Sequence, residues 1–155
     1  MADDITPIRK PEEIIGEAGG LVDSMSVALC IYSDTLDPDV VTQRLGCPPS
    51  HSHRKGDRKG PRSPVEGFKK GAWILTVEGV APTTADELVD LLLRRFPSDE
   101  EFWRALCRDY DVQIRFGVRM EIWNRGFDLS TTTLKLMAST GAKAMFDIYY
   151  YGKDE

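Results

Sequence analysis

Alternation of apolar and polar residues is the clearest pattern in the chain, and it is strictest at 111–120. The even-numbered residues of this segment are apolar and the odd-numbered ones are polar or glycine. Such alternation predicts a strand with one packed face and one face exposed to water. Short apolar segments predict further strands at 26–33 and 72–78, and 142–150 is expected to form the last strand.

Helices are predicted between these strands by their capping residues and apolar spacing. The residues expected to cap them are Asp37, Thr84, Ser98 and Ser130. Gly46 and Gly141 are expected to end the first and the last of these helices. In the last helix, Leu134, Met137 and Ala138 are expected to face inward.

The order of these elements predicts the fold class. Each half of the chain is expected to be strand, helix, strand, with a pair of helices between the halves. Two such βαβ units form a ferredoxin-like, two-layer α+β sandwich, with a four-stranded antiparallel or mixed sheet and helices mainly on one face. We expect one domain at 24–155, preceded by a flexible arm at 1–23 and interrupted by a long loop at 47–71.

Charge is unevenly distributed along the chain. The 155 residues carry a formal net charge of −5. Between His51 and Gly71, however, seven Lys and Arg face two acids, a charge of +5 that leaves −10 for the rest. An acidic body disfavours nucleic acid and anionic membranes as partners, whereas the basic loop favours an acidic protein or an anionic ligand.

The cysteines and the N-terminal sequence predict a cytoplasmic protein. Three cysteines, well separated, argue against a disulfide framework and favour reduced thiols. The first four residues are acidic rather than basic, and no apolar run follows them. The apolar segment 27–32 is too short to cross a bilayer.

Several short motifs together resemble a known family. They occur at 37–46, 53–57, 73–75, 127–130 and 146–149. In combination they resemble the bacterial family named domain of unknown function 4279, over roughly residues 25 to 150. The resemblance implies a compact bacterial α+β domain with no established activity. It supplies no catalytic residues.

The basic loop contains the first candidate site, for an anion or an acidic partner. Its residues are His53, Arg54, Lys55, Asp57 and Arg58. Arginine offers a planar fork for phosphate or carboxylate, and lysine offers a point charge. The segment is not a phosphate-binding P-loop, because no Gly-Lys-Ser/Thr follows a strand. The alternative is a solvated loop whose charge serves solubility.

The exposed face of the sheet is the second candidate site. Its residues are Arg115, Arg119, Asp147 and Tyr149. Asp147 is expected to pair with Arg115 or Arg119 on a neighbouring strand. A nucleic-acid interface on this face is disfavoured, since the aromatic motif of RNA-binding sheets is missing.

Metal binding and catalysis find little support in the sequence. Cys47, His51, His53 and Asp57 are residue types that bind zinc, but their spacing fits no established zinc motif. Both histidines lie in the loop without a residue to orient them as bases. We therefore expect no metal, no cofactor and no catalytic residues, although enzymatic activity stays an open alternative.

The favoured function is thus a non-enzymatic binding module that uses the basic loop. An immunity-type protein that blocks a toxin is one form of such a module. The alternative is a small-molecule or anion-binding protein, or an enzyme, with a pocket completed by loop 47–71. A homodimer is possible, and an ordered homodimer contact on a flat face would favour the binding module.

Overall fold

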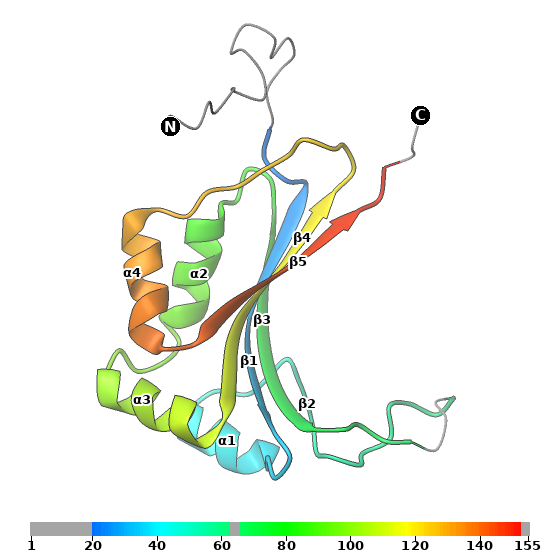
Figure 1. The fold of residues 1–155 in the computed structure, drawn as a ribbon, viewed down its shortest axis with the longest axis vertical. Coiled ribbons are helices and arrows are strands. Elements are labelled where there is room, and N and C mark those ends of the chain that lie inside the picture. Colours follow the sequence, from blue (N-terminus) through cyan, green and yellow to red (C-terminus); the bar gives the residue numbers. More distant parts are fainter. Residues whose placement is uncertain (1–19, 63–65, 153–155) are drawn as a thin grey trace, which may run out of the picture.

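The computed structural model describes residues 20–62 and 66–152, which form one sheet with helices packed against it (Figure 1). The sheet order is β2-β3-β1-β4-β5. The strands are β1 (Ser24–Ser33), β2 (His51–His53), β3 (Gly71–Val80), β4 (Asp111–Met120) and β5 (Lys143–Tyr150). The helices are α1 (Pro38–Leu45), α2 (Ala85–Leu93), α3 (Glu100–Asp109) and α4 (Thr131–Thr140).

The expected α+β class and mixed sheet are confirmed, but the sheet has five strands rather than four. β1 pairs antiparallel with β3 and with β4, β2 pairs antiparallel with β3, and β5 pairs parallel with β4. The extra strand, β2, lies inside the segment predicted as a loop. Its sequence is His-Ser-His, so it carries none of the apolar alternation by which strands are recognised.

The ferredoxin-like duplication is not confirmed, because only the second half contains a parallel βαβ unit. β1 and β3 are direct antiparallel neighbours. A parallel pair needs a crossover that returns along the sheet, and α1, with 8 residues, is only about 12 Å long. It lies instead at one end of the sheet (Figure 1), where Trp73 Nε1 donates a hydrogen bond to Thr42 Oγ1 at 2.9 Å.

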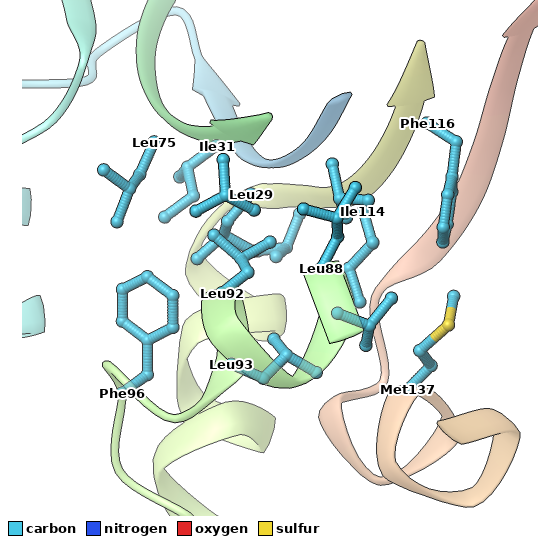
Figure 2. Close-up of a cluster of buried hydrophobic side chains, with 14 of the residues drawn as sticks. Leu29, Ile31, Leu75, Leu88, Leu92, Leu93, Phe96, Ile114, Phe116 and Met137 are labelled. Carbon is cyan, nitrogen blue, oxygen red and sulfur yellow. The ribbon is translucent and has the colours of Figure 1, made fainter. Parts of the chain in front are cut away.

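The core lies between the sheet and the helices (Figure 2). Leu88 and Leu92 of α2 are 2% and 0% exposed and point toward β1, β3 and β4. Leu29 and Ile114, at the centre of the sheet, are completely buried opposite them. Burying such a side chain contributes about 1.5–3 kcal/mol to folding. The centre of this face is therefore closed, and the opposite face of the sheet is left for other roles.

Most of the predicted helix caps are confirmed. Asp37, Thr84 and Ser130 cap their helices, and Gly46 and Gly141 end theirs in the left-handed conformation. The cap predicted at Ser98 is wrong. Asp99 is the N-cap of α3 instead, and its carboxylate accepts hydrogen bonds from the backbone N–H groups of Glu101 and Phe102. A carboxylate is also favoured there by the helix dipole.

The inward face predicted for α4 is only partly correct. Met137 is buried, but Leu134 is 51% exposed and Ala138 is exposed as well. Thr133 and Thr140 are buried in their place. These two threonines and Met137 lie on one helical face, which packs toward α2 and α3. Among the described residues, no helix has the length and apolar character needed to cross a membrane.

Candidate functional site

In its described residues, 47–62 and 66–71, the long basic loop extends β2 and β3 beyond the sheet (Figure 1). We call residues 54–70 the basic hairpin. Its two arms are joined by hydrogen bonds from Gly56 N–H to the Phe68 carbonyl oxygen at 2.9 Å, and from Phe68 N–H to that of Asp57 at 3.0 Å. Gly56 has a φ of +87°, and a side chain on Gly67 would overlap the Gly56 carbonyl. Both glycines are therefore required by the backbone.

Aromatic stacking holds the base of the hairpin. The His53 and Phe68 rings are nearly parallel, with centroids 3.4 Å apart, and the Lys59 ammonium lies 5.7 Å from the Phe68 ring. His51 Nε2 and His53 Nδ1 are 3.1 Å apart. Burial, with the charge of His51, lowers the pKa of His53. The base of the hairpin is therefore built on a neutral imidazole.

Acidic residues outside the hairpin neutralise its first two cations. Arg54 Nη2 lies 2.7 Å from Asp37 Oδ1 and also contacts Asp39, and the charge of Asp37 raises the pKa of the guanidinium. Lys55 Nζ lies 3.5 Å from Asp34 Oδ2. Two members of the predicted anion site are thus already paired with carboxylates of the β1–α1 connection.

Asp57 has a structural role in the same region. Its Oδ2 accepts a hydrogen bond from the Arg54 backbone N–H at 2.7 Å, and the Asp57 backbone N–H donates to the Arg54 carbonyl oxygen. These contacts close a turn, as aspartate side chains commonly do. Asp57 is thus accounted for by the hairpin itself.

The remaining cations of the hairpin face solvent. Five exposed side chains belong to this set, which we call the hairpin cations: Arg58, Lys59, Arg62, Lys69 and Lys70. Within residues 20–62 and 66–152, none of them forms an ion pair with an acid. Arg58 is the one member of the predicted anion site among them. The basic character predicted for the loop therefore resides mainly in residues beyond that site.

The strand register continues the open face of the sheet from β5 to β2. One row crosses all five strands on the face opposite the helices, through His51, Ile74, Cys30, Gln113 and Lys143. His53 points to the same face, two residues further along β2. The sequence did not show this continuity, because β2 was not expected.

The centre of this face is less exposed than the alternation of β4 predicted. Gln113 is 6% and Cys30 1% exposed. Gln113 Nε2 donates to Asp111 Oδ2 at 3.0 Å. Burial raises the pKa of the Cys30 thiol, and burial next to Cys30 raises the pKa of Tyr32 to about 12. Both groups are protonated at neutral pH, so neither is an activated nucleophile.

The predicted residues of the open face lie on β4 and β5. Arg115 Nε is 3.7 Å from Asp147 Oδ2, so the ion pair expected for Asp147 forms with Arg115. Arg119 is exposed and lies opposite Tyr149 in the register. The Tyr149 ring stacks with that of Tyr151. These residues form a polar and aromatic patch at the β5 side of the face.

The metal site considered from the sequence does not come together in the described part of the chain. No group of three or more His, Cys, Asp and Glu side chains is placed there to hold a metal ion. His51 and His53 contact one another, and burial raises the pKa of Cys47.

Hollows on the helical side were missed by sequence reasoning. One of about 300 Å³ lies between α2, α3 and α4 and is lined in part by Phe96, Trp103 and Leu136. Two smaller hollows follow α3 toward the start of β5, past the half-buried Cys107. The helix pair α2–α3 was predicted, but how α4 packs against it was not, because the apolar residues of α4 do not mark its buried face.

A comparison with known protein families shows which family the chain belongs to. The family described as "Domain of unknown function (DUF4279)" matches residues 23–151. The chain belongs to the DUF4279 family. This match confirms the resemblance in the sequence and covers every described helix and strand. No match was found among curated proteins or among solved structures.

Proposed function

We propose that this DUF4279 domain is a non-enzymatic binding module that presents the basic hairpin to an acidic protein or another anionic ligand. The division of charge within the hairpin carries the proposal: Arg54 and Lys55 are neutralised at its base, and the hairpin cations are exposed. A base fixed by stacking and hydrogen bonds holds these cations in place before a partner arrives, which reduces the entropic cost of binding.

The charge of the rest of the chain supports the same proposal. Outside 51–71 the chain carries −10, so an acidic partner is repelled by most of the surface and attracted at the hairpin. Such an arrangement favours fast association and one orientation of docking. An immunity-type protein that blocks a toxin in a bacterial cytosol is one form of this module, by analogy of class.

The contacts within the hairpin favour a binding surface over a pocket. A pocket completed by 47–71 would need polar groups such as His53, Arg54 and Asp57 to converge on a ligand. Each of them is instead engaged in the hairpin, by stacking, by ion pairing or by a backbone hydrogen bond. A small-molecule site or an enzyme at this position is therefore the weaker proposal.

Binding of a labelled poly-glutamate peptide, measured by fluorescence anisotropy, tests the proposal. The test variant replaces all five hairpin cations by Gln. The matched control replaces by Gln five cations in or directly after the helices: Arg94, Arg95, Arg104, Arg108 and Lys135. We expect the test variant to lose at least about tenfold in affinity, because the localised charge is removed, and the control to lose much less.

Two results would contradict the proposal. Equal losses in both variants would mean that the hairpin offers no more than general surface charge. Tighter binding of a labelled single-stranded oligonucleotide than of the peptide, at the same salt concentration, would replace the acidic protein by nucleic acid as the ligand class.

A further inference from the structure

β5 forms the second edge of the sheet, and its outer side has no strand paired to it among the described residues. It is 8 residues long and contains neither proline nor glycine. Unpaired backbone N–H and C=O groups on such an edge are a ready template for another strand, and proteins usually block them with proline, bulges or inward-pointing charges. β5 has no proline and no bulge, and its two charged residues, Lys143 and Asp147, lie on the open face rather than pointing inward.

Apolar side chains accompany this open backbone. Phe146 and Ile148 point to the helical side of β5 but are 45% and 62% exposed, because α4 packs against α2 and α3. The Phe146 ring stacks on the buried Phe116 with centroids 4.8 Å apart. The core thus continues out to the edge of the sheet, where it is left uncovered, as at the interfaces of permanent dimers.

We propose that β5 pairs with β5 of a second copy of this chain, antiparallel and around a two-fold axis, to give a continuous ten-stranded sheet. Two-fold antiparallel pairing places residues of equal parity opposite one another, so the axis passes through one residue of β5. An axis at Phe146 or Asp147 pairs seven residues of each strand, and an axis at Met145 or Ile148 pairs five.

The charges and sizes of the side chains that would face one another favour the axis at Met145. An axis there sets Lys143 opposite the second copy's Asp147 twice, on the open face, and sets the small Ala144 opposite the large Phe146 twice, on the helical face. An axis at Asp147 would instead bring two identical carboxylates together, which is destabilising. An axis at Phe146 or at Ile148 pairs neither charge with an opposite one. The strand is therefore complementary to itself in one register.

Neighbouring charges are compatible with such a contact despite the acidic body. Arg115 and Lys143 balance Asp111 and Asp147 along this edge, and Arg119 adds one cation. The basic hairpin lies at the opposite edge of the sheet (Figure 1), so both copies keep it accessible. The inference thus stands independently of the proposed function.

Charge reversal in the full chain tests the pairing, with sedimentation velocity as the readout. We expect the unaltered chain to dimerise. Lys143→Glu places like charges opposite one another at two positions, and so does Asp147→Lys. Each is expected to raise the dimer Kd at least about tenfold. An equimolar mixture of the two variants should restore a 1:1 dimer, because its substituted positions face one another with opposite charge.

The matched control is Lys135→Glu, which makes the same charge change on an exposed residue of α4 and should leave the dimer intact. Circular dichroism reports whether each variant is folded. Should a reversal prevent folding, Met145→Cys replaces it. Under mild oxidation this variant should give a covalent dimer, since opposed Cβ atoms across strands lie about 4.5–5.5 Å apart, and Lys135→Cys should not.

Three results would overturn the proposal. One is that the unaltered chain is a monomer. The same result is expected if another segment of this chain or a different protein occupies the β5 edge. Another is a dimer that both single reversals leave intact. The third is a mixture of the two variants that stays monomeric while each is folded.

Discussion

The two edges of the sheet differ in how they meet the solvent. β2 is 3 residues long, polar, and leads directly into the basic hairpin, whereas β5 is 8 residues long and carries exposed Phe146 and Ile148. Short, charged edges resist pairing with other strands, and long apolar edges invite it. One sheet therefore carries two kinds of surface, a charged projection at the β2 edge and a strand open to pairing at the β5 edge.

The aromatic side chains next to the two edges also differ, because one is buried and the other is partly exposed. Trp73 lies opposite Ser52 of β2, is completely buried, and is fixed by its hydrogen bond to Thr42. Phe146 is held by stacking on Phe116 and remains 45% exposed. The aromatic side chain at the β2 edge is therefore buried within one chain, whereas the one at the β5 edge is left half-exposed.

Truncation of these two aromatic residues should have the largest effect. Trp73→Ala is expected to lower the free energy of unfolding by about 3–5 kcal/mol, because it empties a fully buried site. Phe146→Ala should cost less than half as much at low concentration, where Phe146 is half-exposed. Urea denaturation of both variants measures the difference. Equal losses would contradict the contrast between the edges.

Removal of the Phe68 ring should have a smaller, local effect. Phe68→Ala deletes the stacking on His53, a contribution of about 0.5–1.5 kcal/mol beyond buried area, and should speed amide exchange at Gly56 and Phe68. Phe68→Tyr keeps the ring and is the control. Hydrogen exchange followed by NMR measures both. Unchanged rates in the alanine variant would mean that stacking does not hold the hairpin.

A change of pH should have the smallest effect, again confined to the hairpin. The pKa of His53 is lowered in the folded chain, so the unfolded chain binds a proton more readily. The stability contributed by neutral His53 is present above the unfolded value of about 6.5 and is lost as the pH falls from there through the folded pKa. Thermal unfolding of His53→Phe between pH 7 and pH 5 should show a weaker dependence than the unaltered chain. An equal dependence would exclude His53 as its source.

Local features of the fold were predictable where the chemistry is local. Asp37, Thr84 and Gly141 cap or end helices through contacts with residues close in sequence, and β4 alternates along its full length. Strand order was not predictable, because pairing of β1 with β3 depends on contacts far apart in the sequence. The exposure of Leu134 likewise depends on which face of α4 meets α2 and α3.

The candidate site was predictable in charge but not in arrangement. The sequence alone shows that the cations cluster between His51 and Gly71. Arg54 pairs with Asp37, and His53 stacks on Phe68, because the chain returns through β2 and β3. A polar strand of three residues gives no signal in the sequence from which this return could be predicted. The pairing edge at β5 was hidden for a similar reason, since an apolar strand indicates burial unless its position in the sheet is known.

Amide hydrogen exchange of β2 and β5, recorded at a low and a high protein concentration, tests the contrast between the edges most directly. The account predicts that the β5 amides facing away from β4 exchange at least about tenfold more slowly at the high concentration, and that the amides of β2 exchange equally at both. Exchange at β5 that does not depend on concentration, or a slowing confined to β2, would contradict it.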